Sequence, residues 1–313
     1  MTGSDQAGAA DYRPDPGQSS HLPRLPGQLP PHQPPCLVMG VVNVTPDSFS
    51  DGGQWLQPQA AIAHGLELWR EGADVIDVGG ESTRPGAQRI AMTDELGRVM
   101  PVVSALAEAG CFVSIDTMRA AVATQALQAG ARMVNDVSGG LADSGMAGVV
   151  AAAGVPYIIT HWRGHSADMY GPATYTDVVA EVRDELALRV TAAVSAGVDP
   201  AQIIVDPGLG FAKLPEHNWT LLANLDRIAC LPGRQERFPV LVAASRKRFI
   251  GRLLASSEGE IRSFVGSDDA TVAITALAVA AGASYVRVHV VPGNVDAVRV
   301  ALRWREEWAV GRQ

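Results

Sequence analysis

Residues able to bind a ligand recur along the chain, each set just after a short apolar run. The positions are Asn43, Asp77 with Glu81, Asp116, Asn135, His161 with Arg163, Asp206, Ser245 to Arg248, and Arg287 with His289. The carboxylates and the amide can pair with the donor edge of a planar heterocycle, whereas Arg and Lys can hold phosphate. This chemistry fits a ligand with a guanidine-like ring at one end and phosphate at the other. A lone Asp after a strand is usually a helix cap or turn former, so the prediction depends on the whole set converging.

The apolar runs themselves predict eight β-strands. They are LVMGVVN from Leu37, ADVIDVGG from Ala73, CFVSIDT from Cys111, RMVNDVSGG from Arg132, VPYIITHW from Val155, QIIVDPGLGF from Gln202, VLVAASRK from Val240 and YVRVHVV from Tyr285. Amphipathic segments lie between them, such as the stripe Val178, Val182, Leu186 and Val190. Continuous apolar runs indicate strands covered on both faces. We therefore expect a closed (β/α)8 TIM barrel, with an open doubly wound sheet as the alternative.

A parallel barrel opens all its strand ends on one face, so the polar residues are expected to surround one mouth. Asp116, Asn135 and Asp206 follow the third, fourth and sixth runs. Lys247 and the Arg287 to His289 segment follow the seventh and eighth, where barrels commonly hold phosphate. We expect acidic and amide groups toward one end of the ligand and basic groups toward the other.

Three Gly-containing segments adjoin this mouth. Residues 45–53 and 81–89 combine Gly, Pro and Ser with charged groups, and we interpret them as loops that close over a ligand. Neither contains a Walker or Rossmann pattern. In DPGLGF, from Asp206 to Phe211, the glycines allow the backbone to approach a flat ring, with Phe211 packing nearby.

Composition restricts the possible partners and locations. The net charge of -8 argues against nucleic acid. No apolar run approaches the ~20 residues that span a bilayer, and no secretory signal is visible, so a cytoplasmic protein that does not enter membranes is expected. Residues 1–35 carry eight of the 20 prolines and are predicted to be a disordered tail, followed by one barrel domain over 36–313. Cys36, Cys111 and Cys230 are expected to be free thiols, and we favour buried positions for them.

Seven motifs occur in a fixed order from Leu37 to about Val291. They are MGVVNVTPDSFSDGG, GADVIDVGGESTRPGA, VSIDT, NDVSGG, DPGLGFAK, SRKRFIG and RVH. In this order they resemble the dihydropteroate synthases. The resemblance implies a barrel that condenses 6-hydroxymethyl-7,8-dihydropterin diphosphate with 4-aminobenzoate, releasing diphosphate and 7,8-dihydropteroate for folate synthesis. It also implies competition by sulfonamides and, from the family alone, a homodimer.

The same resemblance implies a role for each matching residue. Asp116, Asn135, Asp206 and Phe211 are similar to the pterin-binding set, with Lys247 at the carbonyl side of the ring. Arg287, Val288 and His289 match the diphosphate clamp, Thr83 a further diphosphate contact, and Asn43 the residue that helps to hold Mg²⁺. Phe49, Arg84, Pro85 and Ser245 match the aminobenzoate side, and Lys247, Arg287 and His289 are the expected catalytic residues.

Three residues depart from the family pattern. Thr160 stands where Met is common, Ala243 where Gly is common, and Val290 where Asp is common. An extra methyl against a stacked ring costs ~1 to 3 kcal/mol, so Thr160 and Ala243 can alter the floor of a pterin site. Val290 removes a possible orienting carboxylate near His289. Because the polar set is complete, these changes bear on affinity more than on the class of reaction.

Several interpretations remain open at this level. A non-catalytic pterin-binding paralogue, a methyltetrahydrofolate-binding methyltransferase domain and, more remotely, a Schiff-base aldolase using Lys247 are the alternatives in function. Asp77 and Glu81 are either ligands or structural ties of the second loop to the barrel rim. For His161 we favour a packed histidine over a catalyst. Trp304 and Trp308 belong either to the core face of the last helix or to a dimer surface.

Overall fold

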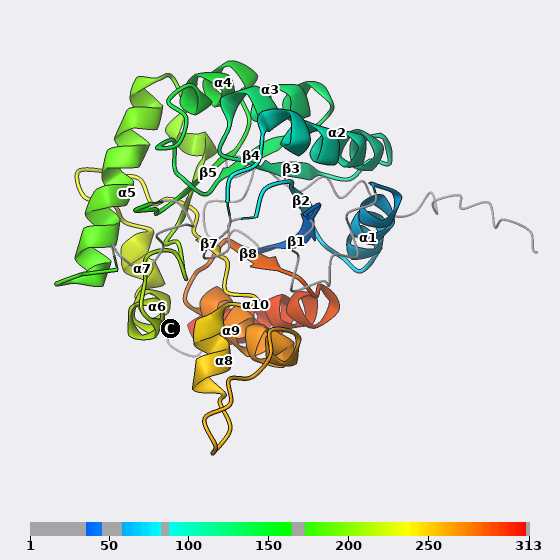
Figure 1. The fold of residues 1–313 in the computed structure, drawn as a ribbon. Helices are drawn as coiled ribbons and strands as arrows, with labels where there is room; N and C mark the ends of the chain where they lie inside the picture. The colour runs from blue at the N-terminus through cyan, green and yellow to red at the C-terminus, as the bar shows by residue number, and fades with distance from the viewer. Residues whose placement is uncertain (1–35, 46–57, 83–87, 165–172, 311–313) are drawn as a thin grey trace, which may run out of the picture.

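The computed structural model describes residues 36–45, 58–82, 88–164 and 173–310, in which eight strands alternate with helices around a common axis (Figure 1). The strands are β1 (Leu37–Asn43), β2 (Val75–Gly79), β3 (Val113–Asp116), β4 (Met133–Asp136), β5 (Tyr157–Thr160), β6 (Ile203–Asp206), β7 (Leu241–Val242) and β8 (Tyr285–Val288). The α-helices are α1 (Pro58–Arg70), α2 (Met92–Glu108), α3 (Ala120–Gln128), α4 (Met146–Ala153), α5 (Val178–Ser195), α6 (Pro215–Leu222), α7 (Leu225–Ile228), α8 (Arg248–Leu253), α9 (Asp268–Ala280) and α10 (Pro292–Val310). Each strand lies within one of the eight predicted runs.

The strands form a parallel sheet that closes on itself. Their order is β6-β5-β4-β3-β2-β1-β8-β7, and every pairing is parallel. The two ends of this order meet where Val205 of β6 forms a parallel bridge with Val240, the residue before β7. The Val205 amide donates to the Pro239 carbonyl there at 2.9 Å. The TIM barrel prediction is confirmed, and the open sheet is excluded.

Two apolar layers hold the barrel together. The larger one lies between the strands and the surrounding helices and includes the predicted stripe on α5. The smaller one fills the interior of the barrel, with at least one residue from each strand or the residue just before it. Its members are Leu37, Met39, Val75, Phe112, Met133, Ile158, Ile204, Leu241 and Tyr285. This plug occupies the amino-terminal part of the lumen and leaves the carboxyl ends of the strands for other side chains.

Other expectations meet the structure at the edges of the fold. All three cysteines are free; Cys36 and Cys111 are buried, and Cys230 is half-buried. Trp304 and Trp308 are 69% and 58% exposed, which excludes the core-face interpretation of this pair. Within the described ranges, no helix has the length and apolar character needed to cross a membrane. The predicted tail over 1–35 lies outside the described residues.

Candidate active site at the mouth of the barrel

The predicted ligand-binding side chains continue the rows of the interior plug. Side chains in a strand alternate between its two faces, so every second residue shares a face. Two residues after Val75, Met133 and Ile204 come Asp77, Asn135 and Asp206, and two after Tyr285 comes Arg287. Asp116 lies four residues after Phe112. The polar set therefore forms the next layers of the lumen, above the apolar plug.

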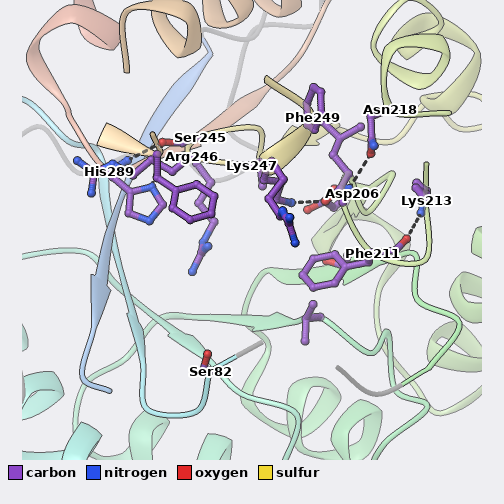
Figure 2. Close-up of a pocket in the computed structure, with 18 of the residues that line it drawn as sticks. Ser82, Asp206, Phe211, Lys213, Asn218, Ser245, Arg246, Lys247, Phe249 and His289 are labelled. Atoms are coloured by element: carbon purple, nitrogen blue, oxygen red, sulfur yellow. Dashed lines mark hydrogen bonds between the residues drawn. The ribbon is translucent and has the colours of Figure 1, made fainter. Parts of the chain in front are cut away.

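These layers form the floor of a cavity of about 540 Å³. Its walls come from residues after β1, β2, β6, β7 and β8, and they include Asn43, Thr45, Glu81, Ser82, Phe211, Lys213, Ser245, Lys247, Phe249 and His289. Figure 2 shows Ser245 and His289 on one side, Phe211 and Lys213 on the other, and Lys247 between them. A cavity of this size suits a ligand of roughly drug-like dimensions.

Arg287 lies among the acidic groups. Its Nε donates to Asp77 Oδ2 at 2.6 Å, and its Nη2 donates to Asp116 Oδ2 at 2.8 Å. Asn135 Nδ2 donates to the same Asp77 oxygen at 2.9 Å. The expected separation of acidic from basic groups is therefore wrong for Arg287. Asp77 is fully buried and orients both Arg287 and Asn135, and its Oδ1 has no hydrogen-bond partner among the described residues.

Burial shifts the proton affinities of the floor. It raises the pKa of Asp116 to about 7, although Arg287 opposes the rise. It also raises the pKa of Asp206, against the field of Lys247. Burial lowers the pKa of Lys247 to about 8, and Asp206 opposes that change. Two groups that face the same ligand thus change charge near neutral pH, as is common at functional sites.

The turn after β6 connects Asp206 with Lys247. Asp206 Oδ1 accepts a hydrogen bond from the Gly208 amide at 2.7 Å. Lys247 Nζ donates to the Leu209 carbonyl and lies 4.8 Å from the centre of the Phe211 ring. An ammonium over an aromatic face is attracted by the ring quadrupole. Phe211 and Lys247 therefore form one wall of the cavity, with Asp206 below them.

On the opposite wall, Ser245 and His289 are paired. Ser245 Oγ lies 2.9 Å from His289 Nδ1 and accepts from the His289 amide at 3.3 Å. Arg246, between Ser245 and Lys247, has a left-handed backbone with φ of 56°. Its guanidinium binds both oxygens of Asp268 at 3.0 Å. This fork anchors a strained residue, so Ser245 and Lys247 can face the same cavity.

The cavity gathers most of the predicted residues. Asn43, Asp116, Asn135, Asp206, Phe211, Ser245, Lys247, Arg287 and His289 all line it. Val288 packs instead in the core behind the strand, because it alternates with Arg287 and His289. Thr83, Arg84, Pro85 and Phe49 lie outside the described residues.

Comparison with known proteins identifies the family. Residues 39–289 match the family model described as pterin binding enzyme. A dihydropteroate synthase of Mycobacterium leprae is 54% identical over 271 residues, covering 86% of this chain and 94% of that protein. The chain belongs to the dihydropteroate synthase family.

Solved structures of this family share the fold. The dihydropteroate synthase of Yersinia pestis, solved as a sulfonamide drug complex, aligns with a TM-score of 0.80 and 36% identity over 87% of this chain and 94% of that one. The Burkholderia cenocepacia enzyme, complexed with 7,8-dihydropteroate, aligns with a TM-score of 0.76 and 38% identity over 89% and 93%.

The three departures from the dihydropteroate synthase pattern take different places. Thr160 and Ala243 are buried and line the cavity, as expected for residues under a bound ring. Val290 is 38% exposed and does not line it. The first two changes can therefore act on ligand affinity directly, whereas Val290 cannot contact a ligand in this cavity.

The sequence interpretation missed several residues of the cavity, Lys213 and Asn218 among them, and underweighted Asp77 below its floor. Lys213 and Asn218 line the cavity, but they follow β6 by more than one turn and no spacing rule singles them out. For Lys213 the signal was its place in the DPGLGFAK motif. Asp77 lies in the same interior row as Asn135, and the period of two after Val75 marks it as a lumen residue.

Proposed function

We propose that this protein is a dihydropteroate synthase that joins 6-hydroxymethyl-7,8-dihydropterin diphosphate to 4-aminobenzoate. One observation carries the proposal: Asp116, Asn135, Asp206 and Arg287 converge as a polar layer on one cavity at the mouth of the barrel. The family relationship and the product bound in the Burkholderia cenocepacia relative support the same reaction.

The polar layer supplies what a pterin ring requires. The pterin carries a guanidine-like edge of donors, and Asp116, Asn135 and Asp206 offer carboxylate and amide acceptors to one cavity. Lys247, held over Phe211, offers a donor for the ring carbonyl, and Phe211 offers a face for stacking. A buried carboxylate that pairs with ring N–H groups gains a charge-assisted hydrogen bond.

The diphosphate is assigned to the upper part of the cavity. His289 and Lys247 provide cationic or donor groups there, Arg287 provides its guanidinium from the floor below, and Thr83 is a further proposed contact. Arg287 is held through its Nε and Nη2 by Asp77 and Asp116, which fixes the direction of its guanidinium. Preorganised donors of this kind contribute about 3 kcal/mol each when they stabilise developing charge.

Magnesium fits this site only as an ion shared with the substrate. Among the described residues no group of three or more His, Cys, Asp or Glu can hold a metal ion. Asn43 brings an amide oxygen to the cavity, and Mg²⁺ commonly takes one or two protein oxygens with phosphate oxygens and water for the remainder. We propose that Asn43 helps to hold Mg²⁺, which supplies charge neutralisation of the diphosphate when bound.

The amine is assigned to the side of the cavity formed by Ser245, with Phe49, Arg84 and Pro85 as proposed partners. The amine nitrogen forms a bond to the pterin methylene carbon, and the carbon–oxygen bond to diphosphate breaks with its electron pair on the leaving group. The new nitrogen centre then loses a proton. A sulfonamide occupies the amine position and competes, as the drug complex of the Yersinia pestis relative suggests.

Turnover with the two proposed substrates tests the function. We expect Mg²⁺-dependent release of diphosphate that requires aminobenzoate, and a fall of about 10²-fold or more in Asp206→Ala and Arg287→Ala, because each loses a buried charged partner of the ligand. Val290→Ala, outside the cavity, is the matched control and keeps the wild-type rate. Tight pterin binding without any diphosphate release would instead indicate a non-catalytic pterin-binding protein, and unchanged rates in both site variants would refute the residue assignment.

We further propose that the enzyme is a cytoplasmic homodimer. The three free cysteines support a reducing compartment. A large apolar surface on α9 and α10 supports self-association. It consists of Leu277, Val300, Trp304 and Trp308, which are 58% to 71% exposed.

A further inference from the structure

Lys213 is a buried amine at the edge of the cavity that the proposed reaction does not use. It is 2% exposed, and its amino group faces the protein rather than the ligand space. Nζ lies 2.9 Å from His161 Nδ1. It also donates to the Phe211 carbonyl at 3.0 Å, as Figure 2 shows. Burial lowers the pKa of Lys213 well below its usual range, although Asp206 opposes the change, and a buried amino group is costly unless it is hydrogen-bonded. Its presence beside the ligand cavity therefore calls for a specific role.

His161 connects Lys213 to helix α5 on the outside of the barrel. Its Nε2 lies 3.0 Å from Glu185 Oε2 on α5, and Glu185 also accepts from Arg163 Nε at 3.0 Å. Burial lowers the pKa of His161 to about 4, so the imidazole is neutral at pH 7. With the Lys213 amino group donating to Nδ1, the histidine carries its proton on Nε2 and donates it to Glu185. The packed interpretation of His161 agrees with this geometry.

The series of contacts from Glu185 through His161 to Lys213 ends at the turn over residues 208–212. This turn is difficult to form without support. Gly208, Gly210 and Ala212 all have left-handed backbones, with φ of 68°, 79° and 47°. Left-handed residues, above all a non-glycine one, persist only where surrounding contacts determine them. Besides Lys213, two side chains from other elements hold the side of this turn away from Lys247: Tyr175 donates to the Ala212 carbonyl at 3.0 Å, and Asn218 accepts from the Gly210 amide at 2.6 Å.

The turn presents two groups to the ligand side. The Leu209 carbonyl accepts from Lys247 Nζ, and the Phe211 ring lies 4.8 Å from the same nitrogen. The first residue of the turn is tied to Asp206 through the Gly208 amide. A displacement of this turn therefore moves Lys247, Phe211 and Asp206 together, whereas Ser245 lies on the opposite wall.

We propose that Lys213, held by His161 and Glu185, is a positioning residue that fixes the Leu209 carbonyl and the Phe211 ring against Lys247. It thereby sets affinity for the pterin substrate and leaves affinity for the amine unchanged. This inference rests on the proposed function, because it assigns the Lys247 wall to the pterin. The contact with His161 makes α5 part of the support for the ligand site.

Lys213→Met tests the role, because it removes the amino group that binds His161 and the Phe211 carbonyl and retains an unbranched side chain. We expect the Kd for 6-hydroxymethylpterin, measured by fluorescence titration, to rise about tenfold or more, since small misplacement of binding groups has effects up to 10²-fold. The KM for the pterin diphosphate rises with it, and the KM for aminobenzoate changes by less than about twofold. Glu185→Gln weakens the contact between Glu185 and His161, at the outer end of the same series of contacts. It is expected to raise the pterin Kd by about threefold.

Arg183→Met is the matched control. Arg183 lies on the same helix as Glu185 and donates Nε and Nη2 to the Cys230 carbonyl at 3.0 and 2.7 Å, far from the cavity lining. The Arg183→Met variant loses a cation–carbonyl contact but is expected to keep the wild-type Kd for the pterin.

An unchanged pterin Kd in folded Lys213→Met, or equal increases in KM for both substrates, overturns the inference. If Lys213→Met does not fold, Glu185→Gln decides, because Glu185 is about one-third exposed. The pterin titration needs no turnover, so a wild-type protein that binds pterin but releases no diphosphate refutes the proposed function alone.

Discussion

Two side chains with shifted pKa values face the proposed pterin position. Burial raises the pKa of Asp116 to about 7, and it lowers the pKa of Lys247 to about 8. Asp116 must be ionised to accept from the pterin edge with full strength, and Lys247 must be protonated to donate. Both conditions are met together only in a narrow range of pH between the two values.

The pH profile of kcat/KM for the pterin diphosphate is therefore expected to be bell-shaped. As pH falls through about 7, Asp116 gains a proton and loses charge, so kcat/KM falls. As pH rises through about 8, Lys247 loses its proton, and kcat/KM falls again. Initial rates at subsaturating pterin diphosphate and saturating aminobenzoate, from pH 5.5 to 9.5, measure both limbs.

Asp116→Asn provides the control for the acid limb. The amide retains an acceptor oxygen but has no proton to gain in this range, so the residual activity is expected to lose its dependence between pH 6 and 7. An acid limb that stays at the same pH in Asp116→Asn assigns the titration to another group and contradicts the prediction.

At the scale of single residues, the sequence predicted well which residue types stand at the strand ends. It predicted less well which side chains pair with one another. Arg287 was placed correctly at the mouth, yet its pairing with Asp77 and Asp116 depends on side-chain torsions that no spacing encodes. Lys213 presents the opposite case: it belongs to a recognised motif, but its partner His161 lies 52 residues earlier, on another strand end. Such contacts exist only after the barrel has closed.

Among the elements, α2 and the end of β3 are joined by a buried polar network. Glu95 of α2 is fully buried and accepts from Thr117 Oγ1 at 2.5 Å and from Arg119. Arg119 also donates to Glu81 at 2.8 Å and to the Ile90 carbonyl at 2.6 Å. Arg119 thus binds Glu81 before the segment 82–89 and Ile90 after it. The interpretation of Glu81 as a structural tie is therefore stronger than its interpretation as a ligand.

Glu95→Ala is expected to lower the free energy of unfolding by about 1–3 kcal/mol, because the Thr117 hydroxyl loses its acceptor and Arg119 loses a buried carboxylate while keeping Glu81 and the Ile90 carbonyl. Asp94→Ala is the matched control: Asp94 precedes Glu95 in the first turn of α2 but is exposed. It loses the helix-dipole contribution alone, about 0.3–1 kcal/mol. Urea unfolding followed by circular dichroism compares the two, and equal losses would show that the network adds nothing to stability.

Strands and long helices could be read from the sequence because burial on both faces leaves continuous apolar runs. The segment from Asp206 to Leu254 was harder to assign. It contains three short helices, the two-residue strand β7 and the left-handed residues Ala212 and Arg246. Tertiary contacts override local preference there, and the same segment supplies Phe211, Ser245 and Lys247 to the cavity.

For the whole molecule, the number of apolar runs in the sequence predicted the architecture better than any single run did. Eight parallel strands with crossover helices predict closure, but the closing contact is a single bridge between Val205 and Val240. Neither residue is distinguished in the sequence. Once the barrel is closed, the period of two places nearly every predicted polar side chain in one cavity, which explains why the site was more predictable than its internal pairing.

The outer surface of α9 and α10 exposes several large apolar side chains. Val300, Trp304 and Trp308 recur every four residues on α10 and are 65%, 69% and 58% exposed. Leu277, on the adjoining α9, is 71% exposed. Helix residues four apart share a face, so α10 presents an apolar stripe beside α9. Stripes of this kind mark protein interfaces more often than free surface.

We predict that the protein is a dimer and that this stripe contributes to the interface. Val300→Lys combined with Trp304→Glu places charges where a partner must be dry, and the double variant is expected to sediment as a monomer at concentrations where the wild type is a dimer. Leu188→Glu is the control, because Leu188 is a 61% exposed leucine on α5, away from α9 and α10, and its loss leaves the dimer intact. Sedimentation equilibrium at about 33 or 66 kDa distinguishes the states, given a chain of 32.9 kDa. A wild-type monomer at high concentration refutes the dimer, and a double variant that still dimerises moves the interface to another surface.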